Sequence, residues 1–453
     1  MNLPNYFLAD LPAEATLTPV MISEACQALK RNRERYLVGR STQSLVKVLS
    51  EVAEGWLDPD YPFRKLALDQ GPDATGFSRA TLAGGLETFF GKLTAENLNA
   101  LLHHELGHPQ RLDQMVATPA EEKARLAAMA SGPELLAHIA PGNVPNPALM
   151  SMVLGALARS AQFLKCARRA AFLPRLFAHS IYYADPKLAA CLEVAEWRGG
   201  ELSLETALFN EADCVAATGS DEMLVEVRQR LPPKVRFLGY GSRVSFGYIC
   251  NEVLSGFGMK KIVARAASDV VAWDQLGCLS PHLFYVEHGG EVSAEGFAEL
   301  LAQELAKREA AEPRGQIQIE TSALIAAKRD FYQVRAAHSP ETRLWASENS
   351  TAWTVVYEAS ARFQLSCLHR FIYIKGVNGL TDALQNADSV RGKVSTVGLA
   401  TPEESADEIA RQLARWGVTR VCPLGQMQNP PLTWRHDGRP SLGDLVTWAD
   451  WER

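Results

Sequence analysis

The stretch that decides the fold runs from residue 134 to residue 166 and reads ELLAHIAPGNVPNPALMSMVLGALARSAQFLKC. In it, a short apolar run (134–140) is followed by a turn rich in proline, a helix-like segment (147–160) and a second apolar run (161–166). Apolar runs of this length, bounded by turn residues, are typical of buried strands. A strand, a helix and a second strand in this order indicate a parallel pair joined by a right-handed crossover.

The same alternation continues along most of the chain. We therefore predict an α/β fold in which parallel sheets carry helices on both faces. Residues 1 to about 130 differ, because their apolar residues recur at helical spacing and predict a mostly helical region. Further strands are expected at 190–197, 213–219, 234–241, 283–290, 352–359, 369–376, 394–400 and 420–425.

Composition narrows the class of protein. A chain of 453 residues is expected to form about two or three domains. The net charge of −6 gives no reason to expect nucleic acid or an anionic membrane as a partner. The eight cysteines include no CxxC or CxxxC pair, and the first ten residues (MNLPNYFLAD) do not read as a signal peptide. We therefore expect a cytoplasmic protein without a membrane span or a structural metal.

The stretch DQLGCLSPH (274–282) carries the most reactive candidate. Cys278 follows Gly277 at the start of a Leu-Ser-Pro-His turn, directly after a helix-like run. A thiol at such a turn faces a neighbouring cleft, whereas a thiol inside an apolar run packs in the core. We interpret Cys278 as a nucleophile and expect Asp274 and Gln275 to brace its loop.

The attacking form of a cysteine is the thiolate, so positive charge near Cys278 would favour the reaction. Arg243, Arg265 and His282 are the candidates for that charge. Buried, unreactive thiols are expected at Cys26, Cys191, Cys214, Cys250 and Cys367.

The first predicted strand end is the segment HIAPGNVP (138–145). Ligands of parallel α/β sheets bind at the carboxyl ends of the strands, so Ala140, Pro141 and Gly142 are candidates for contact with a cofactor. Asn143 in the same turn can offer its side-chain amide N–H to an oxyanion.

Two later strand ends add candidates for a phosphate-bearing ligand. Lys165 emerges at the end of an apolar run with Arg168 close behind, which suits a nucleotide phosphate or, equally, a solvated basic loop. Gly219 and Ser220 precede a helix, where unpaired N–H groups attract phosphate, although Ser220 fits a plain helix cap equally well. Gly241 lies in a glycine-rich stretch that permits close approach of the backbone.

A competing motif is HELGH (104–108), which fits the HExxH pattern of zinc peptidases. Two neighbours argue against zinc. Pro109 disfavours helical geometry at His108, and Gly107 suits a helix end. We interpret the motif as a solvated helix end and keep the peptidase as an alternative.

Taken together, these stretches resemble the LuxC family of acyl-CoA reductases, typified by the fatty-acid reductase of bacterial bioluminescence operons. That family lies within the aldehyde dehydrogenase-like superfamily. The resemblance covers about residues 130 to 453. Its motifs are HIAPGNVP (138–145), LARSAQFLKCARR (157–169), WRGG (197–200), ATGSDE (217–222), RFLGYGSRVSF (236–246), SDVVAWDQLGCLSPH (268–282) and HDGRPSLGDLV (436–446).

The resemblance implies an aldehyde dehydrogenase-like fold: a Rossmann-type cofactor domain and an α/β catalytic domain, with the active site between them. We place a helical part and the NADPH-binding domain at 1–255 and the catalytic domain at 256–400. The segment 401–453 is expected to pack back on the body.

The resemblance also implies roles for single residues. Cys278 corresponds to the nucleophile, and Asn143 with the backbone N–H of that cysteine holds the oxyanion. Lys165 corresponds to a lysine near the adenosine ribose, and Gly219 with Ser220 to the turn that faces the cofactor. NAD-preferring relatives often carry a glutamate at the position of Arg168; a cation there favours NADPH.

The expected reaction is NADPH-dependent reduction of a long-chain acyl-CoA or another acyl thioester to the aldehyde through an acyl-cysteine, with CoA or another carrier leaving. The stretch LGYGSR lacks the acid with which hydrolytic relatives activate water, which agrees with reduction. An acyl-transfer partner protein and a homo-oligomer are also implied. A cysteine acyltransferase or thioesterase without a nicotinamide step, and a non-catalytic partner subunit, stay open as alternatives.

Overall fold

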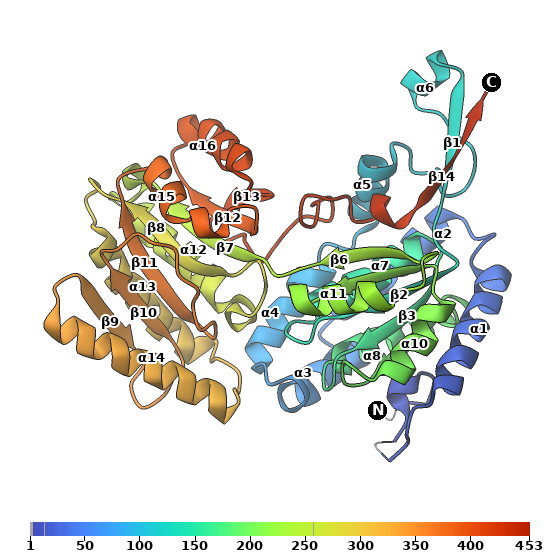
Figure 1. Ribbon diagram of the computed structural model, residues 1–453, viewed down its shortest axis with the longest axis horizontal. Coiled ribbons are helices and arrows are strands. Elements are labelled where there is room, and N and C mark those ends of the chain that lie inside the picture. Colours follow the sequence, from blue (N-terminus) through green and yellow to red (C-terminus); the bar gives the residue numbers. More distant parts are fainter. Residues whose placement is uncertain (1–2, 13, 257) are drawn as a thin grey trace. The chain divides into compact units, whose positions relative to one another are not determined.

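The computed structural model describes residues 3–12, 14–256 and 258–453. Its contacts divide the chain into two compact units (Figure 1). The first unit comprises the chain up to Thr75, then Leu86–Gly241 and Pro431–Arg453; the second comprises Gly76–Gly85 and Ser242–Pro430.

The first unit is built on a five-stranded parallel sheet in the order β4-β3-β2-β5-β6. The chain starts in the middle at β2, adds β3 and β4 on one side, and then crosses to β5 and β6 on the other. The order therefore reverses between β2 and β5, which is where open α/β sheets bind their ligands. The strands are β2 (Leu135–Ile139), β3 (Ala161–Cys166), β4 (Leu192–Glu196), β5 (Cys214–Thr218) and β6 (Arg236–Tyr240).

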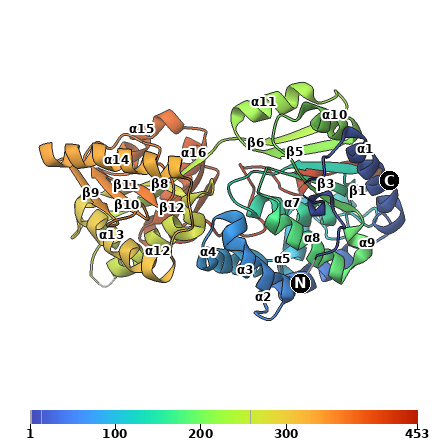
Figure 2. The ribbon, with the colours of Figure 1, turned by 90° about the horizontal axis from the view of Figure 1, so that it is seen from below.

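Helices cover both faces of this sheet (Figure 2). On one face α1, α10 and α11 bury apolar residues; α1 contributes Ile22, Cys26 and Leu29, which lie on one side of the helix. On the other face lie α7 and α8. The connecting helices are α7 (Asn146–Leu157), α8 (Phe172–Ala184), α9 (Pro186–Ala189), α10 (Leu202–Glu211) and α11 (Asp221–Arg230).

The predicted helical start of the chain is confirmed. Its helices are α1 (Pro19–Tyr36), α2 (Thr42–Leu57), α3 (Pro62–Thr75), α4 (Arg79–Phe90), α5 (Ala95–Leu106) and the short α6 (Pro119–Lys123). Side-chain oxygens of Thr18, Ser41 and Thr94 accept backbone N–H groups at the starts of α1, α2 and α5, which fixes where these helices begin. Across the described ranges, no helix combines the length and hydropathy that a bilayer span requires.

The second unit is built on a seven-stranded sheet in the order β13-β12-β7-β8-β11-β10-β9, parallel except for β9. Neighbouring residues of β8 point to opposite faces. Phe284 and Val286 pack with α12 and α13, whereas Leu283 and Tyr285 pack with α14, α15 and α16. The strands are β7 (Val244–Ile249), β8 (Pro281–Glu287), β9 (Thr342–Ala346), β10 (Thr354–Glu358), β11 (Phe371–Val377), β12 (Val394–Ala400) and β13 (Arg420–Pro423).

The helices of this unit are α12 (Gly258–Val271), α13 (Ala294–Ala311), α14 (Ile319–His338), α15 (Leu380–Asn386) and α16 (Glu403–Trp416). Every strand predicted from the apolar runs is present. The sequence reading missed α14 and β9, which lie between two predicted strands; α14 is largely exposed and β9 is partly buried. It also assigned no strand at β1 or at the buried β7.

The contacts divide the chain differently from the expected boundaries at 255 and 400. Residues 242–255 pack in the second unit because β7 pairs with β8 and β12. Residues 401–430 also belong there, since β13 pairs with β12. Only the tail from Pro431 onward packs on the first unit.

That tail is held at three places in the first unit. Its last strand, β14 (Thr447–Glu452), pairs antiparallel with β1 (Leu126–Ser131). The Arg236 guanidinium donates to the carbonyl oxygens of Leu445 and Val446. The Glu105 carboxylate at the end of α5 accepts three successive backbone N–H groups of the tail, from Ser441, Leu442 and Gly443.

We expect Glu105→Ala to lower the free energy of unfolding by about 2–3 kcal/mol and to loosen the tail, because hydrogen bonds to a charged acceptor are the strong ones. Thermal unfolding and limited proteolysis after Pro431 would measure this. His104→Ala, which changes an exposed neighbour on the same helix, is the matched control. Equal protease resistance of the two variants would contradict the anchoring role.

Candidate active site

Cys278 lies in the turn between the 3-10 helix η3 (Ala272–Gln275) and β8. Because β7, β8, β11 and β12 run parallel, a residue just before β8 lies at the amino-terminal edge of the second sheet. The side chain of Cys278 is exposed. The expected exposure of this thiol is therefore confirmed, whereas the cleft that it should face stays a prediction.

The other seven cysteines, all in the described part of the chain, differ from Cys278. Six are buried and Cys367 is partly buried, and none of the eight forms a disulfide. Burial raises the pKa of each of these seven thiols, to about 12 for Cys26 and Cys166, for example. Since the thiolate is the reactive form, these groups are poor nucleophiles near neutral pH.

The turn around Cys278 is fixed by buried polar side chains. The Ser245 hydroxyl, at the start of β7, donates to the Cys278 carbonyl oxygen at 2.8 Å and accepts the N–H of Thr396 at 3.2 Å. The Gln275 amide donates to the carbonyl oxygens of Pro281 and Phe371, at 2.7 and 2.9 Å.

Two further contacts complete the support. Oδ2 of Asp274 accepts the N–H of Gly315 at 3.0 Å, so the expected bracing by Asp274 and Gln275 is confirmed. The Gln428 amide donates to the Ser280 hydroxyl and fills the space beside Gly277 that a Cβ atom would need. The turn therefore has room for glycine and for no larger residue without a shift of Gln428.

Of the three candidates for positive charge near Cys278, His282 does not carry that charge at neutral pH. Burial lowers the pKa of His282 to about 4, so its imidazole is neutral at pH 7. Its Nδ1 accepts the backbone N–H of Ser366 at 3.1 Å, a role that needs the neutral ring. Arg265 lies on α12, where it packs beside Gly425. Arg243, two residues before Ser245, stays a prediction for the cation.

The predicted cofactor residues lie at the carboxyl edge of the first sheet. Ala140 follows β2, and its N–H donates to the Lys165 carbonyl oxygen at 2.9 Å, so the ends of β2 and β3 are joined. Gly142 approaches Ala167 closely, and Asn143 is exposed in the same turn after Pro141.

Lys165 is buried at the end of β3, with Nζ 5.8 Å from the centre of the Trp197 ring. Burial lowers the pKa of its ammonium, and the nearby Glu205 carboxylate opposes this. Arg168 is exposed just beyond. A cation with little water around it, next to an exposed arginine, has the chemistry to meet phosphate or ribose oxygens.

The Gly219–Ser220 junction precedes α11 at the other side of the sheet's reversal point. Ser220 is a helix cap, because its hydroxyl accepts the N–H of Met223 at 3.2 Å. A Cβ atom at Gly219 would meet the side chain of Met223, and one at Gly241 would meet the Asp221 carboxylate. The backbone at both glycines is thus closely packed against side chains of α11.

The structure thus groups the eight predicted cofactor residues and Asn143 on the first unit and places Cys278 on the second. The sequence reading missed Ser245 and Gln428, which hold the turn at Cys278. A serine at the start of an apolar strand is a weak signal, and nothing near Gln428 marks its role.

The HELGH motif does not have the geometry of a zinc peptidase. The helix α5 ends at Leu106, and Gly107 adopts a left-handed conformation (φ 73°), so His108 lies beyond the helix. Nδ1 of His108 accepts the N–H of Gln110 at 3.1 Å. Glu105, which would serve as the base of a peptidase, holds the C-terminal tail instead.

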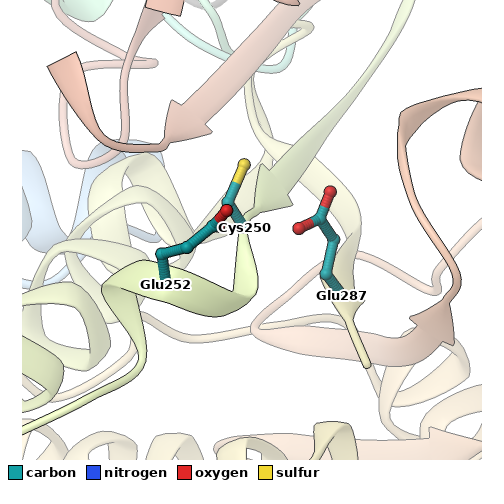
Figure 3. Close-up of side chains that lie close together, drawn as sticks. All are labelled: Cys250, Glu252 and Glu287. Atoms are coloured by element: carbon teal, nitrogen blue, oxygen red, sulfur yellow. The ribbon is translucent and has the colours of Figure 1, made fainter. Parts of the chain in front are cut away.

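Another group of possible metal ligands lies at the carboxyl edge of the second sheet. Figure 3 shows Cys250 and Glu252 facing Glu287, and their ligand atoms lie within 4.8 Å of one another. The Glu287 carboxylate already accepts the Tyr248 hydroxyl and the N–H of Asn251. Burial raises the pKa of Cys250 to about 11, which keeps the thiol protonated and a weak ligand.

Comparison with known proteins agrees with this architecture. A relative from Photorhabdus laumondii, described as a long-chain acyl-protein thioester reductase, is 23% identical over 432 residues, which is 90% of this chain and 82% of that one. The fold is similar to that of a bifunctional proline utilization A protein (TM-score 0.73, 17% identity). The match covers 98% of this chain and 46% of that protein.

Two single-function enzymes match over most of both chains. One is an NAD-dependent benzaldehyde dehydrogenase from Corynebacterium glutamicum (TM-score 0.69, 12% identity, 99% of this chain and 94% of that one). The other is an NADP-dependent glyceraldehyde-3-phosphate dehydrogenase from Bacillus halodurans, complexed with NADP (TM-score 0.70, 12% identity, 96% and 91%). The family model described as acyl-CoA reductase (LuxC) matches residues 37–448. The chain therefore belongs to the acyl-CoA reductase (LuxC) family and has an aldehyde dehydrogenase-like fold.

Proposed function

We propose that this protein reduces an acyl thioester to the aldehyde through an acyl group bound to Cys278, with NADPH as the reductant. The observation that carries the proposal is the contrast among the thiols: Cys278 is exposed in a braced turn, whereas the other seven are buried or partly buried. Membership of the reductase family supports the same reaction class.

In the proposed course, the Cys278 thiolate attacks the thioester carbonyl carbon. The tetrahedral oxyanion takes hydrogen bonds from the Asn143 amide and the Cys278 backbone N–H, and the carrier thiolate leaves with the electron pair of the broken C–S bond. After the acyl carbon is reduced, collapse of the thiohemiacetal breaks its bond to Cys278 and releases the aldehyde. The Ser245 hydroxyl holds the carbonyl oxygen of the same residue, in the next peptide unit, and so limits the movement of the backbone at Cys278.

NADPH would supply the hydride in this reaction. Ala140, Pro141, Gly142, Lys165, Arg168, Gly219, Ser220 and Gly241 are the residues proposed to hold it. The exposed Arg168 supports NADPH over NADH, because a guanidinium binds the additional 2′-phosphate well.

The acyl donor is proposed to be acyl-CoA or an acyl group on a carrier or partner protein. The description of the Photorhabdus relative as an acyl-protein thioester reductase supports a protein-bound donor. CoA is the leaving group only in the first case. A cytoplasmic homo-oligomer stays part of the proposal.

One alternative is a cysteine acyltransferase or thioesterase that uses Cys278 without a nicotinamide. Such an enzyme would release a free acid or transfer the acyl group and would leave NADPH unchanged. A non-catalytic partner subunit would show neither activity.

The direct test is incubation with NADPH and acyl-CoAs of graded chain length, or an acylated carrier protein, while absorbance loss and aldehyde are followed. We expect stoichiometric aldehyde and NADP. Cys278→Ala should abolish both, and Cys367→Ala should not. Thioester loss without NADPH oxidation would instead establish the acyltransferase or thioesterase.

In the same assay, Asn143→Ala should lower kcat on the order of 100-fold with little change in thermal stability, since one oxyanion donor is worth about 3 kcal/mol. Asn146→Ala, three residues further along, is the matched control. Equal rates for the two variants would remove Asn143 from the proposed chemistry.

Arg168→Glu should raise KM for NADPH by about tenfold or more and lower KM for NADH, because a carboxylate repels the 2′-phosphate and accepts hydrogen bonds from a ribose diol. Steady-state kinetics with both nucleotides would measure the switch. Arg169→Glu, which alters the next exposed arginine, serves as the control, and the same switch in both variants would contradict a specific contact.

A limited dose of iodoacetamide at pH 7.5 should modify one cysteine per chain rapidly, since the other seven thiols are buried or partly buried and have raised pKa values. Peptide mass spectrometry should assign the adduct to Cys278. Rapid modification of any other cysteine in the folded protein would contradict the burial pattern.

A further inference from the structure

Two tripeptides near Cys278 share an uncommon backbone conformation. Trp273, Asp274 and Gln275 have φ values of 51°, 50° and 66°, and Leu368, His369 and Arg370 have values of 60°, 55° and 65°. None of the six is glycine. Left-handed residues other than glycine occur singly as a rule, so three in succession persist only where surrounding contacts hold them.

The two tripeptides hold each other through a buried ion pair. Nε of Arg370 donates to Oδ1 of Asp274 at 2.9 Å, and Nη2 lies 2.8 Å from the same oxygen. Both residues are at most 3% exposed. The Gln275 amide adds a second link, because its acceptor at 2.9 Å is the carbonyl oxygen of Phe371, the residue directly after Arg370.

The last turn of α13 and the segment after it supply further partners for this pair. Nη1 of Arg370 donates to the Glu309 carboxylate at 2.9 Å and to the Glu312 carbonyl oxygen at 2.7 Å. The Glu309 carboxylate also accepts the backbone N–H of Arg314, and the next N–H, of Gly315, donates to Asp274. Charged groups buried with this many partners favour one arrangement strongly, because any other arrangement leaves one of them unpaired.

Packing fixes the first residue of the upstream tripeptide as well. The Trp273 ring meets Phe77 edge-on at 5.1 Å between ring centres. It also fills the space where a Cβ atom of Gly85 would lie. Both contacts come from the segment Gly76–Gly85, which belongs to the same unit.

These contacts affect Cys278 because only a short piece of chain separates Asp274 from the point where Ser245 holds the Cys278 carbonyl. Asp274 is four residues before Cys278, and the Ser245 hydroxyl holds the Cys278 carbonyl on the other side. A turn fixed at both ends has few positions for its thiol. We propose that Asp274 and Arg370 are positioning residues, which set the place of the Cys278 thiol by locking the two left-handed tripeptides together. This inference rests on the proposed role of Cys278 as the nucleophile.

The test compares Asp274→Asn and Arg370→Gln with a matched pair elsewhere in the unit. The control variants are Glu358→Gln and Lys375→Met, which break a buried ion pair (3.3 Å) at the carboxyl ends of β10 and β11, away from the edge that carries Cys278. Arg370→Lys retains the charge without the planar fork and serves as the milder variant if Arg370→Gln does not fold.

We expect Asp274→Asn and Arg370→Gln to lower kcat by about 10- to 100-fold with KM for NADPH within about twofold, since small displacements of a reacting group cost rate rather than cofactor binding. The alkylation rate of Cys278 with iodoacetamide should change by at least about fivefold, because the reactivity of a thiol depends on the groups around it and a loosened turn alters those surroundings. Arg370→Lys should bring both rates part of the way back to those of the unsubstituted protein. The controls should lower the melting temperature by a similar amount and leave both rates unchanged.

Equal loss of rate in the control variants, or unchanged rates in Asp274→Asn and Arg370→Lys, would overturn the positioning role. The alkylation measurement needs no substrate, so it tests this inference separately. If Cys278→Ala still reduces thioesters with NADPH, the proposed function fails, whatever the alkylation rates show.

Discussion

Parallel pairing of strands is the constraint on which the rest of this structure depends. In a parallel sheet all strands start at one edge and end at the other, so loops of the same kind gather at the same edge. In the first unit this collects the carboxyl ends of β2, β3, β5 and β6, where Asn143, Lys165, Gly219 and Gly241 lie. In the second unit it places the turn of Cys278 at the amino-terminal edge, beside the start of β7. Residues far apart in sequence become neighbours through this rule alone.

The same rule explains what the sequence could predict. Strands buried on both faces appear as continuous apolar runs, and the turns at their ends stand out by proline, glycine and charge. The segment 134–166 therefore specified a strand, a helix, a strand and their polar ends correctly. The exposed Cys278 was predictable too, since Gly277 and Pro281 mark a turn. Exposed helices and strands were harder to predict from the sequence. The strand β14 is exposed along its whole length, and α14 buries only Ile325 and Tyr332.

The supports of the site were beyond sequence reasoning for a different reason. Asp274 and Arg370 lie 96 residues apart in sequence, and no local sequence pattern indicates that they pair. The left-handed tripeptides also contradict local preference, at roughly 1–2 kcal/mol per residue for side chains other than glycine. His282 is instructive in the same way, because its position in sequence suggested a cation, whereas its burial makes it neutral. Long-range contacts decided each of these cases.

The first unit is discontinuous in sequence, and this affects the order in which it can be completed. Ribosomal synthesis proceeds from the amino terminus, so all of the residues 242–430 emerge before the tail that pairs with β1. Until then the Glu105 carboxylate and the Arg236 guanidinium lack the backbone partners that the finished protein gives them. The nascent first unit therefore stays open at this end until residues 431–453 have been synthesised.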